Sequence, residues 1–316
     1  MANRAILAGI IVGDGAPVAV AGALNVSPES FYHGSIVTRG DHLLRAGEAM
    51  ARAGAVFIDV GAMSTAPYRS SRVPASLESD RLGWAVELLA RKLDLPVSAD
   101  TSRLEPARAA IQAGARIIND VTGLTGDPRL AALVARSGIG LILMASERRA
   151  RTPTGTAGRR PVRRGRAGTA RGGRRTSRVG RSRSGDEAID TVTARLAESL
   201  AIARAAGISP SRIAVDPGIG FFRAQPMSWH EWDCAVLARL HRLRRLGRPV
   251  CVGVSRKSFI GAVAGVEDPA RRLPGSLAAV ALAVREGSQL IRTHDVEETI
   301  QAVTVAEAIR RAAGDA

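Results

Sequence analysis

The sequence is poor in cysteine and in aromatic residues. Its 316 residues include two cysteines, and phenylalanine, tryptophan and tyrosine together make up 3%. Cys234 and Cys251 do not have the spacing of a metal-binding motif, and two cysteines do not make a disulfide framework in a chain of this length. Hydrophobic residues still amount to 46%. We therefore expect a sizeable core, filled mainly by alanine, valine, leucine and isoleucine.

Long apolar runs are also missing. No run reaches the roughly 20 residues that a membrane-spanning helix needs, and the first residues do not resemble a signal peptide. These absences predict a soluble, cytoplasmic protein that does not bind membranes.

Acidic residues and lysine are absent from residues 148–185, which contain 14 arginines. Nearly all of the formal net charge of +16 lies there, and the rest of the chain is close to neutral. The segment has almost no bulky apolar residues, so it cannot bury enough surface to fold. We interpret it as a disordered, dispensable insert, or as the product of a gene read locally out of frame.

A nucleic-acid-binding arm is the alternative for this basic segment, because arginine clusters bind phosphates in a salt-dependent way. It would make the protein a binding module whose affinity falls steeply with salt. The segment lacks interleaved aromatic residues on which bases could stack. Nucleic acid is therefore not expected as a partner.

The rest of the chain alternates apolar strand patterns with helical patterns, which predicts a single (β/α)₈ TIM barrel over residues 1–316. The basic insert interrupts it after the fifth strand. A doubly wound open sheet is the competing architecture, but no GxGxxG motif opens a first βα unit. The expected strands are residues 18–24, 55–60, 96–100, 116–119, 140–144, 212–216, 249–254 and 289–292. The expected helices are residues 41–52, 77–93, a helix from about 105, 128–137, 187–206, 229–246, a helical region over 257–285, and 296–311.

Polar side chains stand at the ends of four expected strands: Asp59, Asp100, Asn119 with Asp120, and Asp216. Each acid could simply cap the next helix. The carboxyl ends of parallel strands, however, all face one mouth of a barrel, where active sites lie. Four such positions, each after an apolar run, favour a shared polar site.

Three of these residues form the predicted pocket. The carboxylates of Asp100 and Asp216 and the amide of Asn119 can together accept from and donate to a flat heterocycle with a mixed edge, such as an aminopyrimidine. Leaving such groups unpaired is costly, so the trio would be selective.

A cationic rim is expected beside this pocket. Lys257 and Ser258 follow the seventh strand, where a helix start could bind an anion. Arg292 and His294 follow the eighth, and a guanidinium matches phosphate oxygens. Arg256 has an equally good interpretation as a structural ion-pair partner. These residues indicate a binding site for a diphosphate.

Three further polar residues extend this rim. Asn25 could hold a phosphate oxygen or complete the shell of Mg²⁺, which shares few protein ligands. Ser64 and Thr65 lie on a loop with hydroxyls suited to phosphate. No nucleophile–base pair stands out, so the pattern favours displacement at an activated carbon with diphosphate as the leaving group.

The ordered segments NVSPESF, STAP, SADTS, IINDVTGL, DPGIGF, GVSRKSFIG and IRTHDV resemble those of the dihydropteroate synthase family, from about Val18 to Ala308. The resemblance implies a pterin-binding barrel and a transferase of folate biosynthesis. Such an enzyme joins a (dihydropterin-6-yl)methyl diphosphate to the arylamine p-aminobenzoate in an SN1-like reaction that releases diphosphate. It also implies Mg²⁺ as cofactor and a homodimer.

The resemblance implies roles for individual residues as well. Lys257, Asp100 and Asp216 would be catalytic. The pterin would be held by Asp100, Asn119, Asp216 and Lys257; the diphosphate by Asn25, Ser64, Thr65, Arg292 and His294; the metal by Asn25; and the arylamine by Phe31, Pro67, Phe221 and Ser258.

Two loops depart from the family pattern. His33 replaces an acid in the first, and Ala66 replaces an arginine in the second. A changed arylamine would explain this: the methanopterin-pathway homologue uses a ribofuranosyl-aminobenzene phosphate. A pterin-binding paralogue with little synthase activity is a second alternative. A pterin-binding methyltransferase barrel is disfavoured, because it has no use for the SRKS and RTHD segments.

Overall fold

The computed structural model describes residues 3–26, 36–63, 73–147 and 178–314, with the side chains of 36–39 and 178–184 outside that description. Eight parallel strands form one sheet in the order β8-β7-β6-β5-β4-β3-β10-β9. A parallel bridge between Val215 and Val250 joins its two edges, so the sheet closes into the predicted (β/α)₈ barrel. The strands are β3 (Ala19–Asn25), β4 (Ile58–Gly61), β5 (Val97–Asp100), β6 (Ile117–Asp120), β7 (Gly140–Met144), β8 (Ile213–Asp216), β9 (Cys251–Val252) and β10 (Leu290–Thr293).

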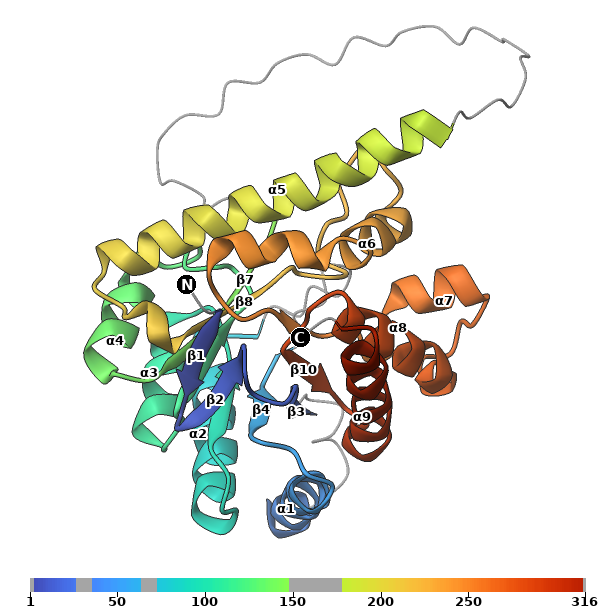
Figure 1. Ribbon diagram of the computed structural model, residues 1–316. Helices are drawn as coiled ribbons and strands as arrows, with labels where there is room; N and C mark the ends of the chain where they lie inside the picture. The colour runs from blue at the N-terminus through green and yellow to red at the C-terminus, as the bar shows by residue number, and fades with distance from the viewer. Residues whose placement is uncertain (1–2, 27–35, 64–72, 148–177, 315–316) are drawn as a thin grey trace, which may run out of the picture.

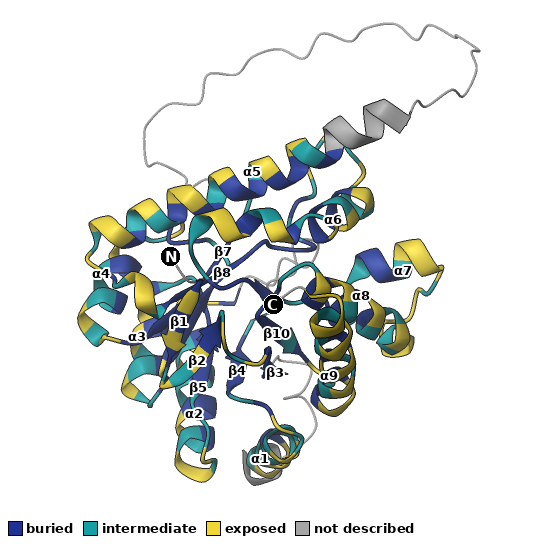
Figure 2. Cartoon of the chain, viewed as in Figure 1, coloured by how far each residue is buried: buried dark blue, intermediate teal, exposed yellow. Residues whose placement is uncertain are grey.

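The helices surround the strands as a ring (Figure 1). Their buried faces are turned toward the barrel and their exposed faces toward solvent, as the colours of α2 and α5 show in Figure 2. None of the helices in the described ranges is both long and apolar enough to cross a membrane. They are α1 (Ile36–Arg52), α2 (Ala75–Lys92), α3 (Leu104–Gln112), α4 (Pro128–Ser137), α5 (Arg178–Ala205), α6 (Trp229–Leu237), α7 (Ser258–Ala264), α8 (Leu273–Arg285) and α9 (Val296–Ala312).

Alternation along each strand divides the core into two parts, because successive side chains point to opposite faces. Outward-facing residues pack against the helices in one large aliphatic cluster. Inward-facing residues fill the amino-terminal part of the barrel with a second, smaller cluster. Its members in the strands or directly before them are Ala19, Ala21, Phe57, Ile117, Ile142, Ala214, Cys251 and Leu290.

A hairpin that the sequence did not predict closes the amino-terminal end of the barrel. Strands β1 (Arg4–Leu7) and β2 (Ile10–Gly13) pair antiparallel, and Leu7 and Val12 complete the inner cluster. The chain reverses at Ala8 and Gly9, both with positive φ. Strands of four residues with only partial alternation give too little periodic signal to be recognised.

Two expected helices are interrupted. The predicted helix over 229–246 ends at Leu237, and residues Leu240–Leu246 continue as a 3₁₀-helix. The region predicted over 257–285 is divided between α7 and α8, because Gly265 takes a left-handed φ of 69° and ends α7. Such a conformation favours glycine and stops a helix. The strand expected over 249–254 is only two residues long.

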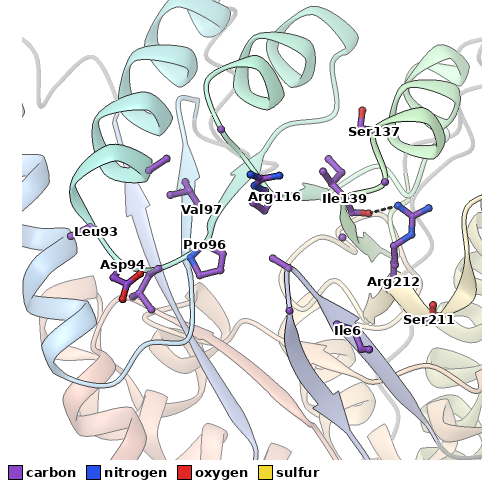
Figure 3. A pocket seen from close by; sticks show the side chains of 17 residues that line it. Ile6, Leu93, Asp94, Pro96, Val97, Arg116, Ser137, Ile139, Ser211 and Arg212 are labelled. Atoms are coloured by element: carbon purple, nitrogen blue, oxygen red, sulfur yellow. Dashed lines mark hydrogen bonds between the residues drawn. The ribbon is translucent and has the colours of Figure 1, made fainter.

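A cavity of about 860 Å³ lies at the amino-terminal end of the barrel (Figure 3). It is lined by residues that precede β5, β6, β7 and β8, among them Pro96, Arg116, Ile139 and Arg212. Arg212 donates to the carbonyl of Ile139 at 3.2 Å. The predicted site residues follow the strands instead, so they lie at the other end of the barrel.

The hairpin supplies a test of how the barrel is closed. Leu7 is 0% exposed and its neighbour Ile6 is 50% exposed on the opposite face of β1. We expect Leu7→Ala to lower the free energy of unfolding by about 2–5 kcal/mol, because it leaves a cavity in the inner cluster. Ile6→Ala, the matched control, should change it by less than about 1 kcal/mol. Urea denaturation curves measure both changes in the free energy of unfolding. Equal effects of the two substitutions would contradict the conclusion that Leu7 fills the end of the barrel.

Candidate active site

The strand register brings Asp100 and Asn119 side by side at the mouth, and Asp216 lies two residues further along its own strand. Asp100 pairs with Gly61 on one side and with Asn119 on the other, and Met144 pairs with Asp216. Asp100, Asn119 and Asp216 are all buried. Asn119 and Asp216 lie two residues after Ile117 and Ala214 of the inner cluster, and Asp100 is paired with Asn119, so all three side chains lie on the inner face.

Arg292 lies among acidic side chains in the middle of the barrel. Its Nη2 donates to Oδ2 of Asp100 at 3.0 Å, and its Nε donates to Oδ2 of Asp59. Asn119 Nδ2 donates to the same Asp59 oxygen at 3.0 Å. One guanidinium thus joins β10 to β4 and β5, and Asn119 extends the network to β6.

Asp59 is a site residue to which sequence reasoning gave no role of its own. It is 0% exposed, and its only sequence signal was an acid at the end of an apolar run. Within the described ranges, Oδ1 of Asp59 and Oδ1 of Asp100 have no hydrogen-bond partner. Buried polar atoms without partners are costly, and each of these two oxygens can accept a further hydrogen bond.

Burial has the largest effect on the pKa of Asp100 and on that of Asp216. It raises the pKa of Asp100 to about 7, against the opposing effect of Arg292 and with a further rise from Asp59. Burial also raises the pKa of Asp216, and the positive charge of Lys257 works in the opposite direction. A carboxyl that titrates near neutral pH can accept or donate a hydrogen bond, which suits a heterocycle with a mixed edge.

The turn after β8 is shaped by glycine. Gly218 has φ of 73°, and a Cβ there would lie 2.2 Å from the carbonyl oxygen of Ala145, so only glycine fits. Its N–H donates to Oδ1 of Asp216 at 2.7 Å. The turn therefore fixes the Asp216 carboxyl against the end of β7.

Lys257 extends over this turn. Its ammonium donates to the carbonyl of Ile219 and lies 4.9 Å from the centroid of the Phe221 ring, within cation–π range. Burial lowers the pKa of Lys257, and the negative charges of Asp216 and Asp233 oppose that effect.

Asp233 on α6 is a second acid without a predicted role. It is 1% exposed, and its Oδ1 accepts from the N–H of Gly220 at 2.8 Å. Burial raises its pKa to about 6. It supports the turn below Lys257. An acid within an otherwise apolar helix face was the only signal for it.

The segments after β9 and β10 are joined to each other. A hydrogen bond of 3.0 Å connects Oγ of Ser255 to Nδ1 of His294. Arg256 binds both oxygens of Asp295, at 2.9 and 2.5 Å. It is therefore a structural ion-pair partner, which was one of the two interpretations of this residue from the sequence. Desolvation and the charge of Arg292 lower the pKa of His294 to about 4. His294 is therefore neutral at pH 7.

Asn25 ends β3 at the same mouth. A Cβ at Gly61 would lie 3.2 Å from Oδ1 of Asn25 and 3.7 Å from Oδ2 of Asp100. Gly61 thus leaves room in which an amide oxygen and a carboxylate oxygen approach each other. Asn25 is exposed, so its oxygen is accessible to a ligand.

The structure describes only some of the residues that were predicted to bind the arylamine. Phe221 lies beside Lys257, and Oγ of Ser258 accepts from Nη2 of Arg223 at 2.7 Å. Several predicted residues lie outside the described residues: Phe31, Ser64, Thr65 and Pro67, the altered loop positions His33 and Ala66, and residues 148–177 of the basic insert.

The barrel carries two carboxyls, an amide and a partly buried guanidinium at its mouth, and this combination suits the class of pterin-binding enzymes. A family model described as "Pterin binding enzyme" matches residues 21–294, and the chain belongs to that family. Within it, the chain belongs with the dihydropteroate synthases, as its relatives and structural neighbours indicate.

Two relatives and two solved structures illustrate the similarity. The dihydropteroate synthase of Synechocystis sp. is 33% identical over 292 residues, covering 92% of this chain and 90% of that protein. The one from Escherichia coli K12 is 32% identical over 289 residues, with 92% and 90% covered. Dihydropteroate synthase of Xanthomonas albilineans with 4-aminobenzoic acid is 33% identical with a TM-score of 0.77, covering 98% of this chain and 99% of that one. The same enzyme with 7,8-dihydropteroate is 32% identical with a TM-score of 0.75, covering 97% and 98%.

The raised pKa of Asp100 gives a prediction about stability. The folded pKa of about 7 lies above the ordinary aspartate value of 3.8, so the folded state binds the proton more tightly than the unfolded state between about pH 4 and pH 7. Ionisation of Asp100 therefore costs stability as the pH rises through this window. Asp100→Asn loses the ion pair with Arg292 at every pH, but it does not ionise, so between pH 4 and pH 7 its free energy of unfolding should change by about 2–4 kcal/mol in its favour relative to that of the wild type.

Chemical denaturation at several pH values measures this difference. The matched control is Asp80→Asn, since Asp80 is exposed on α2 and should show a difference that does not vary over the same window. A constant difference between wild type and Asp100→Asn would contradict the raised pKa.

Proposed function

We propose that this protein is a dihydropteroate synthase, a transferase that condenses a (dihydropterin-6-yl)methyl diphosphate with p-aminobenzoate and releases diphosphate in folate biosynthesis. The observation that carries the proposal is the convergence of Asp100, Asn119 and Asp216 at the mouth of a barrel of this family. The relatives named dihydropteroate synthase match over nearly the whole chain, which supports it.

The pterin would be held by four side chains. The carboxyls of Asp100 and Asp216 would accept from ring N–H and amino groups, and Asn119 would pair with a neighbouring ring atom. Lys257 would lie over the other edge, where it places a positive charge beside Asp216. These contacts fix the reacting methylene group in position, which lowers the entropic part of the barrier.

The departing diphosphate would meet hydrogen-bond donors at the rim. Arg292 would contribute charge, and His294, neutral at pH 7, would contribute a ring N–H rather than a charge. Asn25, Ser64 and Thr65 would supply further polar contacts. Fixed donors aimed at developing negative charge stabilise the transition state without reorganisation.

The residues present fit a role for Mg²⁺. Among the described residues, no group of three or more His, Cys, Asp or Glu side chains is arranged to hold a metal. Magnesium keeps most of its waters and often binds through one or two protein oxygens together with substrate phosphates. The Asn25 oxygen, close to Asp100 across Gly61, is suited to that arrangement. A bound Mg²⁺ would neutralise charge on the diphosphate.

Carbon–oxygen cleavage would precede attack, in an SN1-like displacement. The bond between the pterin methylene and diphosphate breaks, and the resulting pterin cation is positioned by Asp100 and Asp216. The arylamine nitrogen then attacks the methylene and loses a proton. Phe221, together with Phe31 and Pro67, would pack on the arylamine ring, and Ser258 would bind its other end.

We also propose that the protein works in the cytoplasm as a homodimer. Large apolar side chains are exposed on α7, α8 and α9, and surface apolar groups of this size favour contact with a partner. They are Val263, Leu282, Val305 and Ile309.

Diphosphate release from the full chain tests the synthase activity. Asp216→Asn should lower kcat/KM by about 100-fold or more, because a charge-assisted hydrogen bond to the pterin is lost. The control Asp80→Asn should stay within about 2-fold of wild type. Undiminished activity in Asp216→Asn would exclude this carboxyl from the reaction.

The same assay separates the possible arylamines. Turnover with p-aminobenzoate identifies a folate enzyme, whereas turnover only with the ribofuranosyl-aminobenzene phosphate identifies the methanopterin-pathway homologue. If neither amine is used although the pterin diphosphate binds, the protein is a pterin-binding paralogue and the synthase proposal is wrong.

The metal proposal has its own test. Activity should be abolished by EDTA and restored by Mg²⁺, and Asn25→Ala should raise the Mg²⁺ concentration for half-maximal activity by about 10-fold, since it removes one protein oxygen. Asn3→Ala, far from the mouth beside Asp14 of the amino-terminal hairpin, should leave that concentration unchanged. An identical Mg²⁺ dependence in Asn25→Ala and wild type would refute the role of Asn25.

A further inference from the structure

Arg223 lies between β8 and α6, at the mouth, and several groups fix its position. Its Nε donates to the carbonyl of Gly220 at 3.0 Å, and its Nη2 donates to Oγ of Ser258 at 2.7 Å. The guanidinium lies 4.1 Å from the ring centroid of Trp229. The backbone N–H of Arg223 donates to Glu147 at 2.9 Å. A guanidinium held this way is pre-organised, so little entropy is lost when it binds a ligand.

The hydrogen bond to Ser258 has a direction that matters. Arginine only donates, so Oγ of Ser258 is the acceptor. No described residue accepts the hydroxyl proton of Ser258, so this proton can be donated to a ligand, and the adjacent guanidinium strengthens the hydroxyl as a donor. The pair Arg223–Ser258 is therefore built to donate to an anion.

A second cation stands close by. A Cβ placed at Gly220 would lie 3.8 Å from both Nη2 of Arg223 and Nζ of Lys257. The nearby carboxylates accept from backbone amides: Asp233 from Gly220 and Glu147 from the backbone of Arg223. Two cations thus approach one glycine next to the aromatic ring of Phe221, which lies 4.9 Å from the Lys257 ammonium, and Asp233 is an acid that interacts with both.

We propose that Arg223 is a specificity-determining residue that selects arylamines with a negative charge at the end opposite the amine. The inference rests on the proposed function. The ring of the arylamine would pack on Phe221, its amine would face the pterin beside Lys257, and its carboxylate would face the Arg223–Ser258 pair. Arg223 acts on the charge of the substrate, partly through the hydroxyl of Ser258.

The test compares a charged with a neutral arylamine. Diphosphate release is measured with p-aminobenzoate and with p-aminobenzamide, which has the same shape without the charge. Arg223→Met should lower kcat/KM for p-aminobenzoate by about 10- to 100-fold, mainly through KM, because charge-assisted hydrogen bonds are lost. For p-aminobenzamide the change should stay below about 3-fold, and KM for the pterin diphosphate should not change.

Two further variants show whether the effect is one of charge or of folding. Arg223→Lys keeps the charge and should recover part of the preference for p-aminobenzoate. The matched control is Arg91→Met, which breaks an exposed ion pair with Glu87 on α2 and should behave as wild type. Equal losses with both arylamines in Arg223→Met, or no loss with p-aminobenzoate, would overturn the inference.

Binding provides a readout that does not need turnover. Calorimetry with each arylamine, in the presence of inorganic diphosphate and Mg²⁺, should show that wild type prefers p-aminobenzoate by about 10-fold and that Arg223→Met has lost this preference. Equal binding of the two arylamines to wild type would contradict the role of Arg223. Absent turnover in wild type would refute the synthase proposal alone, since the binding preference is measured independently.

Discussion

The guanidinium of Arg292 lies between two buried carboxyls, and the centre of the molecule depends on that contact. Asp59 and Asp100 come from neighbouring strands, both bind this guanidinium, and the charge of Asp59 raises the pKa of Asp100. Removing one partner of a buried ion pair is strongly destabilising, because the remaining charge is left without compensation. Arg292 therefore compensates the negative charge of Asp59 and Asp100 inside the barrel, and the three side chains remain together at its mouth.

The position of Arg292 also links stability to function. Oδ1 of Asp59 and Oδ1 of Asp100 have no partner among the described residues, and both lie on the carboxyls that the guanidinium binds. A hydrogen-bond donor on a ligand that reached one of these oxygens would satisfy it. Substrate binding should thus stabilise the fold more than the area it buries would indicate, since bound ligand shifts the folding equilibrium.

The sequence predicted what depends on local pattern. Each of Asp100, Asn119 and Asp216 follows an apolar run and ends a parallel strand at the same edge of the barrel, and the strand register brings Asp100 and Asn119 side by side without further information. The ion pair between Asp59 and Arg292 could not be predicted, because it joins residues 233 positions apart. Asp233 was missed for a similar reason: its contact with Gly220 depends on how α6 packs on the turn.

The sequence also failed to predict short elements and contacts between loops. The β1–β2 hairpin consists of strands of four residues, and its importance comes from Leu7 entering the barrel rather than from any periodic signal. The division between α7 and α8 follows from one glycine with a positive φ, which a helical pattern does not reveal. Arg223 gave no signal at all, because its proposed role depends on its contact with Ser258 at the start of α7, further along the chain.

Glu147 joins two loops that are far apart in the sequence. Its carboxylate accepts from the backbone of Arg223 and Ala224 and from the side chain of Gln225, so it ties the segment after β7 to the loop after β8. These contacts hold the backbone at Arg223, whereas Ser258 binds its guanidinium. The shape of this part of the mouth therefore depends on a residue that directly precedes the arginine-rich segment.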